Sequence, residues 1–239
     1  MNIKHYWINI DQCIDRKEYM EKQFTENNIE HFRISAVTPE NIINYDIKRH
    51  PDSKESPSEI CCLLSHIKAL QKGYDDGHEY FCVAEDDINV PKLNFEKMFT
   101  YMNDEKTDID IIQLHTSSTV SLMEVLNENI LNGNMKFIAH RKHDCPGAVY
   151  YLVSRNGAKK ILDHFKISHT QYDFSFSSWT AADNMLYRVV NTYIITYPIM
   201  TTNIKLGSIM HEHHLHHHEN ANELVRQIHK KYPLLHHYT

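Results

Sequence analysis

The sequence predicts an α/β fold in which a mainly parallel, twisted sheet is flanked by helices. Two observations carry this prediction. Segments with strand character alternate with segments of helical periodicity along most of the 239 residues. The strand expected at 79–84 is a continuous apolar run, which is typical of a strand covered on both faces. We expect one α/β domain over residues 1–210, followed over 211–239 by a histidine-rich tail that can form a short helix.

The first elements alternate between strand and helix. Residues 3–10 predict a strand, a helix starts near Asp15, and residues 29–37 alternate as a second strand that Pro39 ends. The polar stretch 44–56 has few apolar residues and predicts a flexible surface loop.

The next helix has the clearest start signal in the chain. Ser56, Pro57 and Glu59 supply an N-cap, a proline at the first helical position and the acid of a capping box. Gly73 is a candidate C-cap. His66 falls at the edge of the apolar face of this helix, so it is either satisfied within the core or points into a cleft.

The remaining elements follow the same reasoning. Residues 116–134 read as a long variable excursion with no element assigned to it. We expect a helix from 91, strands at 108–114, 135–140 and 148–153, a helix capped by Ser154, a short helix at 179–190 and a last strand at 192–198.

Composition excludes several classes of function. The chain has 25 Lys and Arg against 31 Asp and Glu and no dense basic stripe, so we expect no nucleic-acid partner. No stretch approaches the roughly 20 apolar residues of a transmembrane helix, and none is expected. The five cysteines lack C-x-x-C spacing, which argues against a zinc ribbon or disulfide framework. A reducing compartment fits this pattern, so we expect a cytoplasmic protein, free or peripheral to a membrane.

Three consecutive acids, Glu85, Asp86 and Asp87, follow directly after the apolar strand. Adjacent carboxylates repel one another, and a divalent cation commonly relieves that repulsion. A solvated acidic turn is the alternative, because turns favour Asp. Open α/β sheets bind ligands at the carboxyl ends of their strands, where these acids are expected to lie. The position therefore favours a metal or ligand site.

Six segments, in order along residues 3–210, resemble glycosyltransferase family 25, which includes the lipooligosaccharide-type and collagen-type galactosyltransferases. Three of them carry most of the likeness: PSEICCLLSHIKAL at 57–70, FCVAEDDINV at 81–90 and GAVYYLVSRNGAKKIL at 147–162. The others are WINIDQCIDRKEYM at 7–20, AADNMLYRV at 181–189 and TYPIMTTNIKLGSIM at 196–210.

The resemblance implies a GT-A fold and a hexosyltransferase. Such an enzyme moves a sugar, galactose or glucose here, from a UDP-sugar donor to a hydroxyl of a glycan, glycolipid or glycoprotein, with inversion. It also implies a divalent cation, Mn²⁺ or Mg²⁺, held by Glu85 and Asp87, with Asp86 facing elsewhere, toward the ribose. Hard oxygen ligands suit both ions. Asp183 matches a downstream Asp of the family and is the candidate catalytic base; the alternative is an N-cap or surface helix residue.

The first-strand loop supplies the candidate nucleotide-binding residues. By resemblance, Asn9, Asp11 and Arg16 lie near the base and ribose, and we add His66 to this group. Arg16 could instead pair with an acid on its own helix. The chain departs from the family at Cys61 and Cys62, where alanine is usual. It also departs at 116–134, a poorly matched region that would shape the acceptor site.

Residues 210–219 hold six of the 19 histidines. One imidazole from this segment could complete the metal shell, and His211 and His213 are the candidates because they follow the Ser208 segment most closely. The alternative is a tail that binds metal only nonspecifically.

Two other classes of function remain open. A noncatalytic relative could bind sugar nucleotides or glycans, although an intact pair of Glu85 and Asp87 argues against it. A metal-dependent phosphohydrolase could use the same acidic strand end, with Asp110 and Asp144 as weak candidates for its further ligands.

Overall fold

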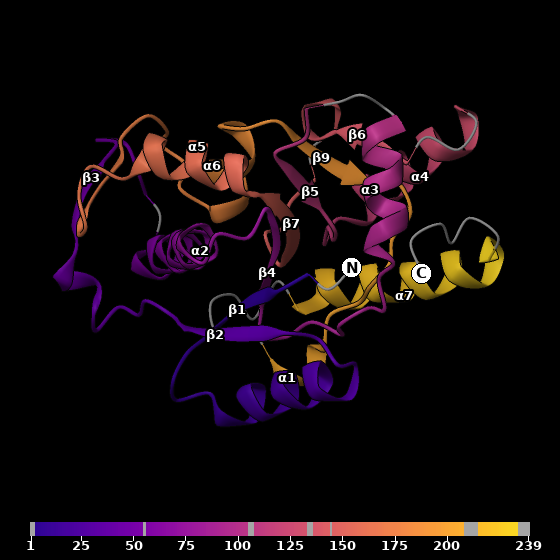
Figure 1. Ribbon diagram of the computed structural model, residues 1–239, viewed down its shortest axis with the longest axis horizontal. Coiled ribbons are helices and arrows are strands. Elements are labelled where there is room, and N and C mark those ends of the chain that lie inside the picture. The colour runs from indigo at the N-terminus through magenta and orange to yellow at the C-terminus, as the bar shows by residue number, and fades with distance from the viewer. Residues whose placement is uncertain are drawn as a thin grey trace.

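A seven-stranded sheet forms the centre of the computed structural model (Figure 1). The structure describes residues 3–54, 56–104, 108–132, 136–143, 145–207 and 215–233. The strand order is β2-β1-β4-β7-β5-β9-β6. The strands are β1 (His5–Asn9), β2 (His31–Ser35), β4 (Tyr80–Glu85), β5 (Ile111–Gln113), β6 (Phe137–Ala139), β7 (Tyr150–Ser154) and β9 (Thr192–Ile195).

The predicted mainly parallel sheet is confirmed, with two reversed strands. β1 pairs in parallel with β2 and β4, and β5 pairs in parallel with β9. β7 is antiparallel to both β4 and β5, and β6 is antiparallel to β9. The carboxyl ends of β1, β4 and β5 therefore meet the amino end of β7 at one edge of the sheet.

Helices cover both faces of this sheet (Figure 1). Alternating side chains divide the core, since Tyr6 and Val83 face one layer while Trp7 and Cys82 face the other. The first layer contains α2 (Pro57–Asp75), α5 (Arg155–Phe165) and α6 (Ala182–Arg188). The second contains α1 (Ile14–Glu26), α3 (Phe95–Asp104) and part of α7 (Leu215–Lys231).

The start of α2 confirms the predicted capping box. Ser56 accepts a hydrogen bond from the Glu59 backbone, and the Glu59 carboxylate accepts one from the Ser56 backbone at 2.8 Å. Pro57 occupies the first helical position. This fixed start sets the register of α2, which places His66 at the carboxyl end of β4.

Three features differ from the prediction. Gly73 lies inside α2, whose C-cap is Asp76. The excursion expected at 116–134 contains a helix, α4 (Thr119–Leu131), capped by Ser118. The loop expected at 44–56 contains β3 (Asp46–Arg49), which pairs in parallel with β8 (Gln171–Phe174). β3 is mostly exposed, so its sequence carries no alternating pattern, and its partner is remote in sequence.

Helix α7 begins within the histidine run and packs on the rest of the chain. Ala221 and Val225 contact Leu122 of α4. Asn222 holds the helix to Thr202, accepting from its backbone nitrogen at 2.9 Å and donating to its carbonyl at 2.8 Å. Among the described residues, no helix is long and apolar enough to cross a membrane.

Candidate functional site

The middle acid of the strand end is engaged within the protein. Asp86 is buried, and its carboxylate accepts hydrogen bonds from Asn9 Nδ2 at 2.7 Å and from the guanidinium of Arg16. Arg16 therefore pairs across elements and not with an acid of its own helix. These contacts join three residues that the sequence predicted to lie together.

Arg16 also explains how three acids can be adjacent. Its guanidinium is buried, lies 3.7 Å from Asp87 Oδ2 and donates to the Gly207 carbonyl at 2.6 Å. One cation therefore offsets part of the negative charge of both Asp86 and Asp87. The acidic stretch carries more negative charge than Arg16 neutralises.

The two outer acids remain available to a ligand. Asp87 Oδ1 is buried and accepts no hydrogen bond from the residues that the structure describes. Burial and the negative charge of Glu85 raise the pKa of Asp87 to about 7. An orphaned buried oxygen beside a second carboxylate fits a hard divalent cation.

Glu85 meets His66 at the inner wall of the site. His66 Nε2 lies 3.3 Å from Glu85 Oε1, and His66 Nδ1 lies 3.3 Å from the Tyr151 hydroxyl. Burial raises the pKa of Glu85, but the hydrogen bond to His66 and the nearby basic side chains, including Arg16, outweigh it, so the pKa is lower than usual. His66 is fully buried and also borders a cavity. It is therefore both a core residue and a residue at a cleft, the two alternatives that the sequence left open.

Asp11 lies in the exposed turn that follows β1. Its exposed carboxylate accepts hydrogen bonds from Arg33 and from the Ser35 hydroxyl, both at 2.7 Å. Arg33 in turn donates to Asn9 Oδ1 at 3.1 Å. Asp11 therefore orients Arg33 and, through it, the amide of Asn9.

Asp183 faces the site from the first turn of α6. Its Oδ2 accepts from the Gly147 backbone nitrogen at 2.6 Å, and its Oδ1 accepts from the Asn184 backbone nitrogen at 2.7 Å. Gly147, just before β7, has a φ of 111°, which side-chain-bearing residues rarely adopt. The N-cap of α6 is Ala181, so Asp183 is not its cap.

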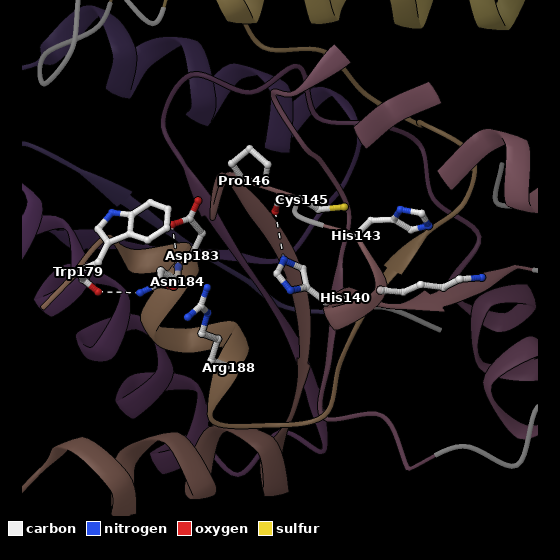
Figure 2. Close-up of a pocket in the computed structure, with 9 residues that line it drawn as sticks. His140, His143, Cys145, Pro146, Trp179, Asp183, Asn184 and Arg188 are labelled. Atoms are coloured by element: carbon white, nitrogen blue, oxygen red, sulfur yellow. Dashed lines mark hydrogen bonds between the residues drawn. The ribbon is translucent and has the colours of Figure 1, made fainter. Parts of the chain in front are cut away.

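Three cavities with shared walls follow the sheet edge. The first, about 160 Å³, lies between the β1 loop and α2, and shares Cys62 and Glu85 with the second, about 260 Å³. The third, about 490 Å³, shares Pro146, Trp179 and Asp183 with the second. Figure 2 shows Trp179, Asp183 and Arg188 on one side of the third cavity, with His140 and His143 across from them.

Asp110, one of the two acids proposed for a phosphohydrolase, does not join these walls. Asp110 lies before β5, at the opposite edge of the sheet, where its two oxygens accept from Lys160 at 2.8 Å. It also accepts from the Asn191 backbone nitrogen at 3.0 Å. Asp144 lies outside the described residues.

Comparison with known proteins identifies the family. The model of glycosyltransferase family 25 (LPS biosynthesis protein) matches residues 2–176. The chain belongs to glycosyltransferase family 25. This match confirms the resemblance over most of its predicted extent, while Trp179, Asp183 and α7 lie beyond the matched residues.

The chain is similar to curated proteins of one bacterium and one virus. A putative glycosyltransferase of Haemophilus influenzae is 25% identical over 169 residues, covering 68% of this chain and 57% of the relative. The lipooligosaccharide biosynthesis protein lic2B of Haemophilus influenzae is 24% identical over 168 residues, covering 67% and 62%. A putative glycosyltransferase of Acanthamoeba polyphaga mimivirus is 34% identical over 103 residues, covering 40% and 32%. The chain thus spans about three-fifths of the length of the two bacterial relatives.

Two solved glycosyltransferases are loosely similar. One is a mutant of Drosophila beta-1,4-galactosyltransferase 7, crystallised with manganese, UDP-Gal and xylobiose, with a TM-score of 0.41 and 10% identity, covering 85% of this chain and 71% of that chain. The other takes part in glycosylation of the major capsid of PBCV-1, with a TM-score of 0.35 and 7% identity, covering 82% and 92%.

The structure also places at this candidate site a histidine that was not predicted from the sequence. His218 of α7 lines the second cavity together with Glu85 and Asp183. Its ring stacks on the buried His115, with centroids 6.2 Å apart and planes 4° from parallel. Burial lowers the pKa of both histidines, that of His115 to about 3.

The two histidines chosen from the sequence, His211 and His213, lie outside the described residues. The histidine run in the sequence was the signal that could have identified His218. Helical periodicity from Leu215 onward would have been needed to select it, because Val225 and Ile228 set the buried face of α7.

Proposed function

We propose that this protein is a hexosyltransferase of the GT-A type. It transfers galactose or glucose from a UDP-sugar to a hydroxyl of a glycan, glycolipid or glycoprotein, with inversion, in the cytoplasm. Family membership supports the transfer of a sugar, and the five free thiols suit a reducing compartment. One observation supports the reaction site most strongly: the candidate metal ligand Glu85 and the candidate base Asp183 line the same cavity.

The first cavity would take the nucleotide. It is bordered by Asn9, by Val37 and Pro39 after β2, and by the first turns of α2. Glu85 and Asp87 would hold Mn²⁺ or Mg²⁺ at its inner end, with His218 nearby on α7. When bound, the ion neutralises the diphosphate as it becomes the leaving group.

The second cavity would take the donor sugar, and Asp183 would act from its far wall. The Gly147 and Asn184 backbone nitrogens each donate one hydrogen bond to the carboxylate, which keeps it oriented. Each carboxylate oxygen retains a further lone pair that can accept the proton of the acceptor hydroxyl. Since Asp183 also borders the third cavity, an acceptor seated there would present its hydroxyl to this oxygen.

The third cavity has an aromatic wall suited to a sugar ring. The Trp179 side chain is half exposed, although large aromatic side chains are usually buried. Its backbone is held in place, since its carbonyl accepts from Asn184 Nδ2 at 2.7 Å and its nitrogen donates to the Ser177 hydroxyl at 3.1 Å. We propose that Trp179 is the platform on which the acceptor sugar stacks.

The competing functions fit less well. A noncatalytic binding protein needs no oriented carboxylate between two cavities, yet Asp183 is held there by two backbone donors. A phosphohydrolase needs further metal ligands at neighbouring strand ends, and Asp110 lies at the opposite edge of the sheet.

A panel of nucleotide sugars tests this proposal. The assay measures free nucleotide diphosphate, with and without Mn²⁺, because such enzymes transfer slowly to water without their acceptor. We expect one UDP-hexose to be turned over by the native protein, and Asp183→Asn to bind it normally but to turn it over about 10²- to 10⁴-fold more slowly.

Asp163→Asn is the matched control, because Asp163 is an exposed acid of α5 that pairs with Lys159. This variant should behave as the native protein does. Equal turnover by Asp183→Asn and the native protein would remove Asp183 as the base. Absence of both binding and turnover for every nucleotide sugar would contradict the proposed function.

A further inference from the structure

A second set of potential metal ligands lies beside the acidic strand end. Cys62 and His66 are one helical turn apart on α2, so both face the same side of the helix. Glu85 meets them from the end of β4. One ligand atom from each, the thiol sulfur, an imidazole nitrogen and a carboxylate oxygen, lies within 4.8 Å of the other two. Three side chains of different chemistry, two from α2 and one from β4, thus converge on one point.

We propose that Cys62, His66 and Glu85 form a binding site for a thiophilic divalent cation, Zn²⁺ in particular. Zinc accepts mixed sulfur, nitrogen and oxygen ligands in tetrahedral sites, whereas Mg²⁺ and Mn²⁺ prefer oxygen alone. The set therefore differs in kind from the oxygen donors of Glu85 and Asp87. Cys62 binds as the thiolate, so each zinc bound releases the thiol proton to solvent.

The surroundings of the cluster support this assignment. The imidazole is already oriented, because its Nδ1 lies 3.3 Å from the Tyr151 hydroxyl while its Nε2 faces Glu85. Metal-binding histidines usually have such a partner on the second ring nitrogen. Cys62 and Glu85 also line the second cavity, which leaves the fourth position of a tetrahedral ion open to water or to a ligand.

Glu85 belongs both to the proposed zinc site and to the proposed site of the activating ion, so zinc binding should affect activity. An ion held by Cys62 and His66 would draw Glu85 toward α2 and away from the donor diphosphate. Zinc should therefore inhibit transfer by occupying a position that the activating ion does not. This consequence rests on the proposed function, whereas the binding site itself does not.

Cobalt absorption spectroscopy tests the site directly. Co²⁺ takes the place of Zn²⁺, and a bound thiolate adds a charge-transfer band in the near ultraviolet that imidazole and carboxylate ligands do not give. The full chain, stripped with a chelator, is titrated with Co²⁺. We expect the band in the native protein and in Cys61→Ala, a neighbouring cysteine outside the cluster, and its loss in Cys62→Ala. A native protein without the band, or a band that persists in Cys62→Ala, would overturn the proposal. Binding by histidines of the C-terminal run leaves this band unchanged.

An alkylation experiment needs no substitution. The native chain is treated with iodoacetamide with and without Zn²⁺, and labelled peptides are quantified by mass spectrometry. We expect zinc to protect Cys62 but not the partly exposed Cys13, which lies outside the cluster. Equal labelling of Cys62 under both conditions would overturn the site.

The inhibition is measured on the reaction itself. Zn²⁺ should inhibit nucleotide-sugar turnover at a concentration at least about tenfold lower for the native protein than for Cys62→Ala. Equal sensitivity of the two proteins would overturn the inhibitory role. If the native protein turns over no nucleotide sugar, the proposed function fails, while the cobalt and alkylation results still decide the site.

Discussion

Replacement of Arg16 by methionine should destabilise the protein strongly. The side chain is buried, and its loss removes the ion pair with Asp86, the bond to the Gly207 carbonyl at 2.6 Å and the attraction to Asp87 at 3.7 Å. Methionine keeps most of the volume, so little of the effect comes from a cavity. Among the residues that the structure describes, Asp86 would keep only its bond from Asn9. Removing one partner of a buried pair costs about 3–5 kcal/mol, which is the loss we expect near neutral pH.

The loss should depend on pH with a defined sign. Burial raises the pKa of Asp86 even with Arg16 present, and burial together with Glu85 raises that of Asp87 to about 7. A raised pKa means that the folded state holds the proton more tightly, so the contribution of these two acids to stability is complete below their unfolded pKa and is lost as pH rises through the folded pKa. Without Arg16 both pKa values rise further. The deficit of Arg16→Met should therefore shrink as pH falls from about 7 to about 4.

Urea denaturation at both pH values measures this effect. Arg33→Met is the matched control, because Arg33 forms a more exposed pair with Asp11 and should lose only about 1 kcal/mol or less. A loss below about 1 kcal/mol in Arg16→Met, or a loss independent of pH, would refute the view that Arg16 compensates the acidic strand end.

Two further predictions concern the acceptor wall and the core. Trp179→Ala should raise the KM for acceptor by about 10-fold or more, whereas Trp179→Phe should retain most of the stacking. Donor binding should stay native in both variants. An unchanged KM of Trp179→Ala in kinetic assays would remove Trp179 as the platform. Burial lowers the pKa of His5 from 6.5 to about 4, so its contribution to stability is complete above pH 6.5 and is lost as pH falls toward 4. The shift in the pKa of His5 corresponds to about 3 kcal/mol of stability. His5→Gln should remove this contribution to the pH dependence of the unfolding free energy, which denaturation experiments measure. The same loss of stability at low pH in the native protein and in His5→Gln would contradict the prediction.

Local signals in the sequence predicted much of this architecture. The capping box of α2 and the apolar run of β4 are complete within a few residues, so their elements could be predicted directly. The acids Glu85 and Asp87 stood out because a strand end in such a sheet is a ligand position. Asn9, Arg16 and Asp86 were expected to share a site, and they are in direct contact.

Elements that depend on long-range contacts could not be predicted from local sequence signals. β3 is stabilised by a partner strand more than a hundred residues later, and its own exposed residues carry no pattern. Helix α4 had a local signal, the Ser118 cap followed by Leu122, Val125 and Leu126, which the polar residues around it obscured. His218 reaches the site because α7 docks through the Asn222–Thr202 hydrogen bonds and the packing of Ala221 and Val225 on α4. No local pattern encodes these long-range contacts.

Metal-dependent binding of the donor tests the central claim most directly. Calorimetry with UDP, with and without Mn²⁺, compares the native protein with Asp87→Ala and with Asp163→Ala as the matched control. We predict that Mn²⁺ strengthens UDP binding to the native protein and to the control, and that Asp87→Ala loses this gain by about 10- to 100-fold or more while remaining folded. Undiminished Mn²⁺-dependent binding by Asp87→Ala would contradict a metal-assisted donor site at the end of β4.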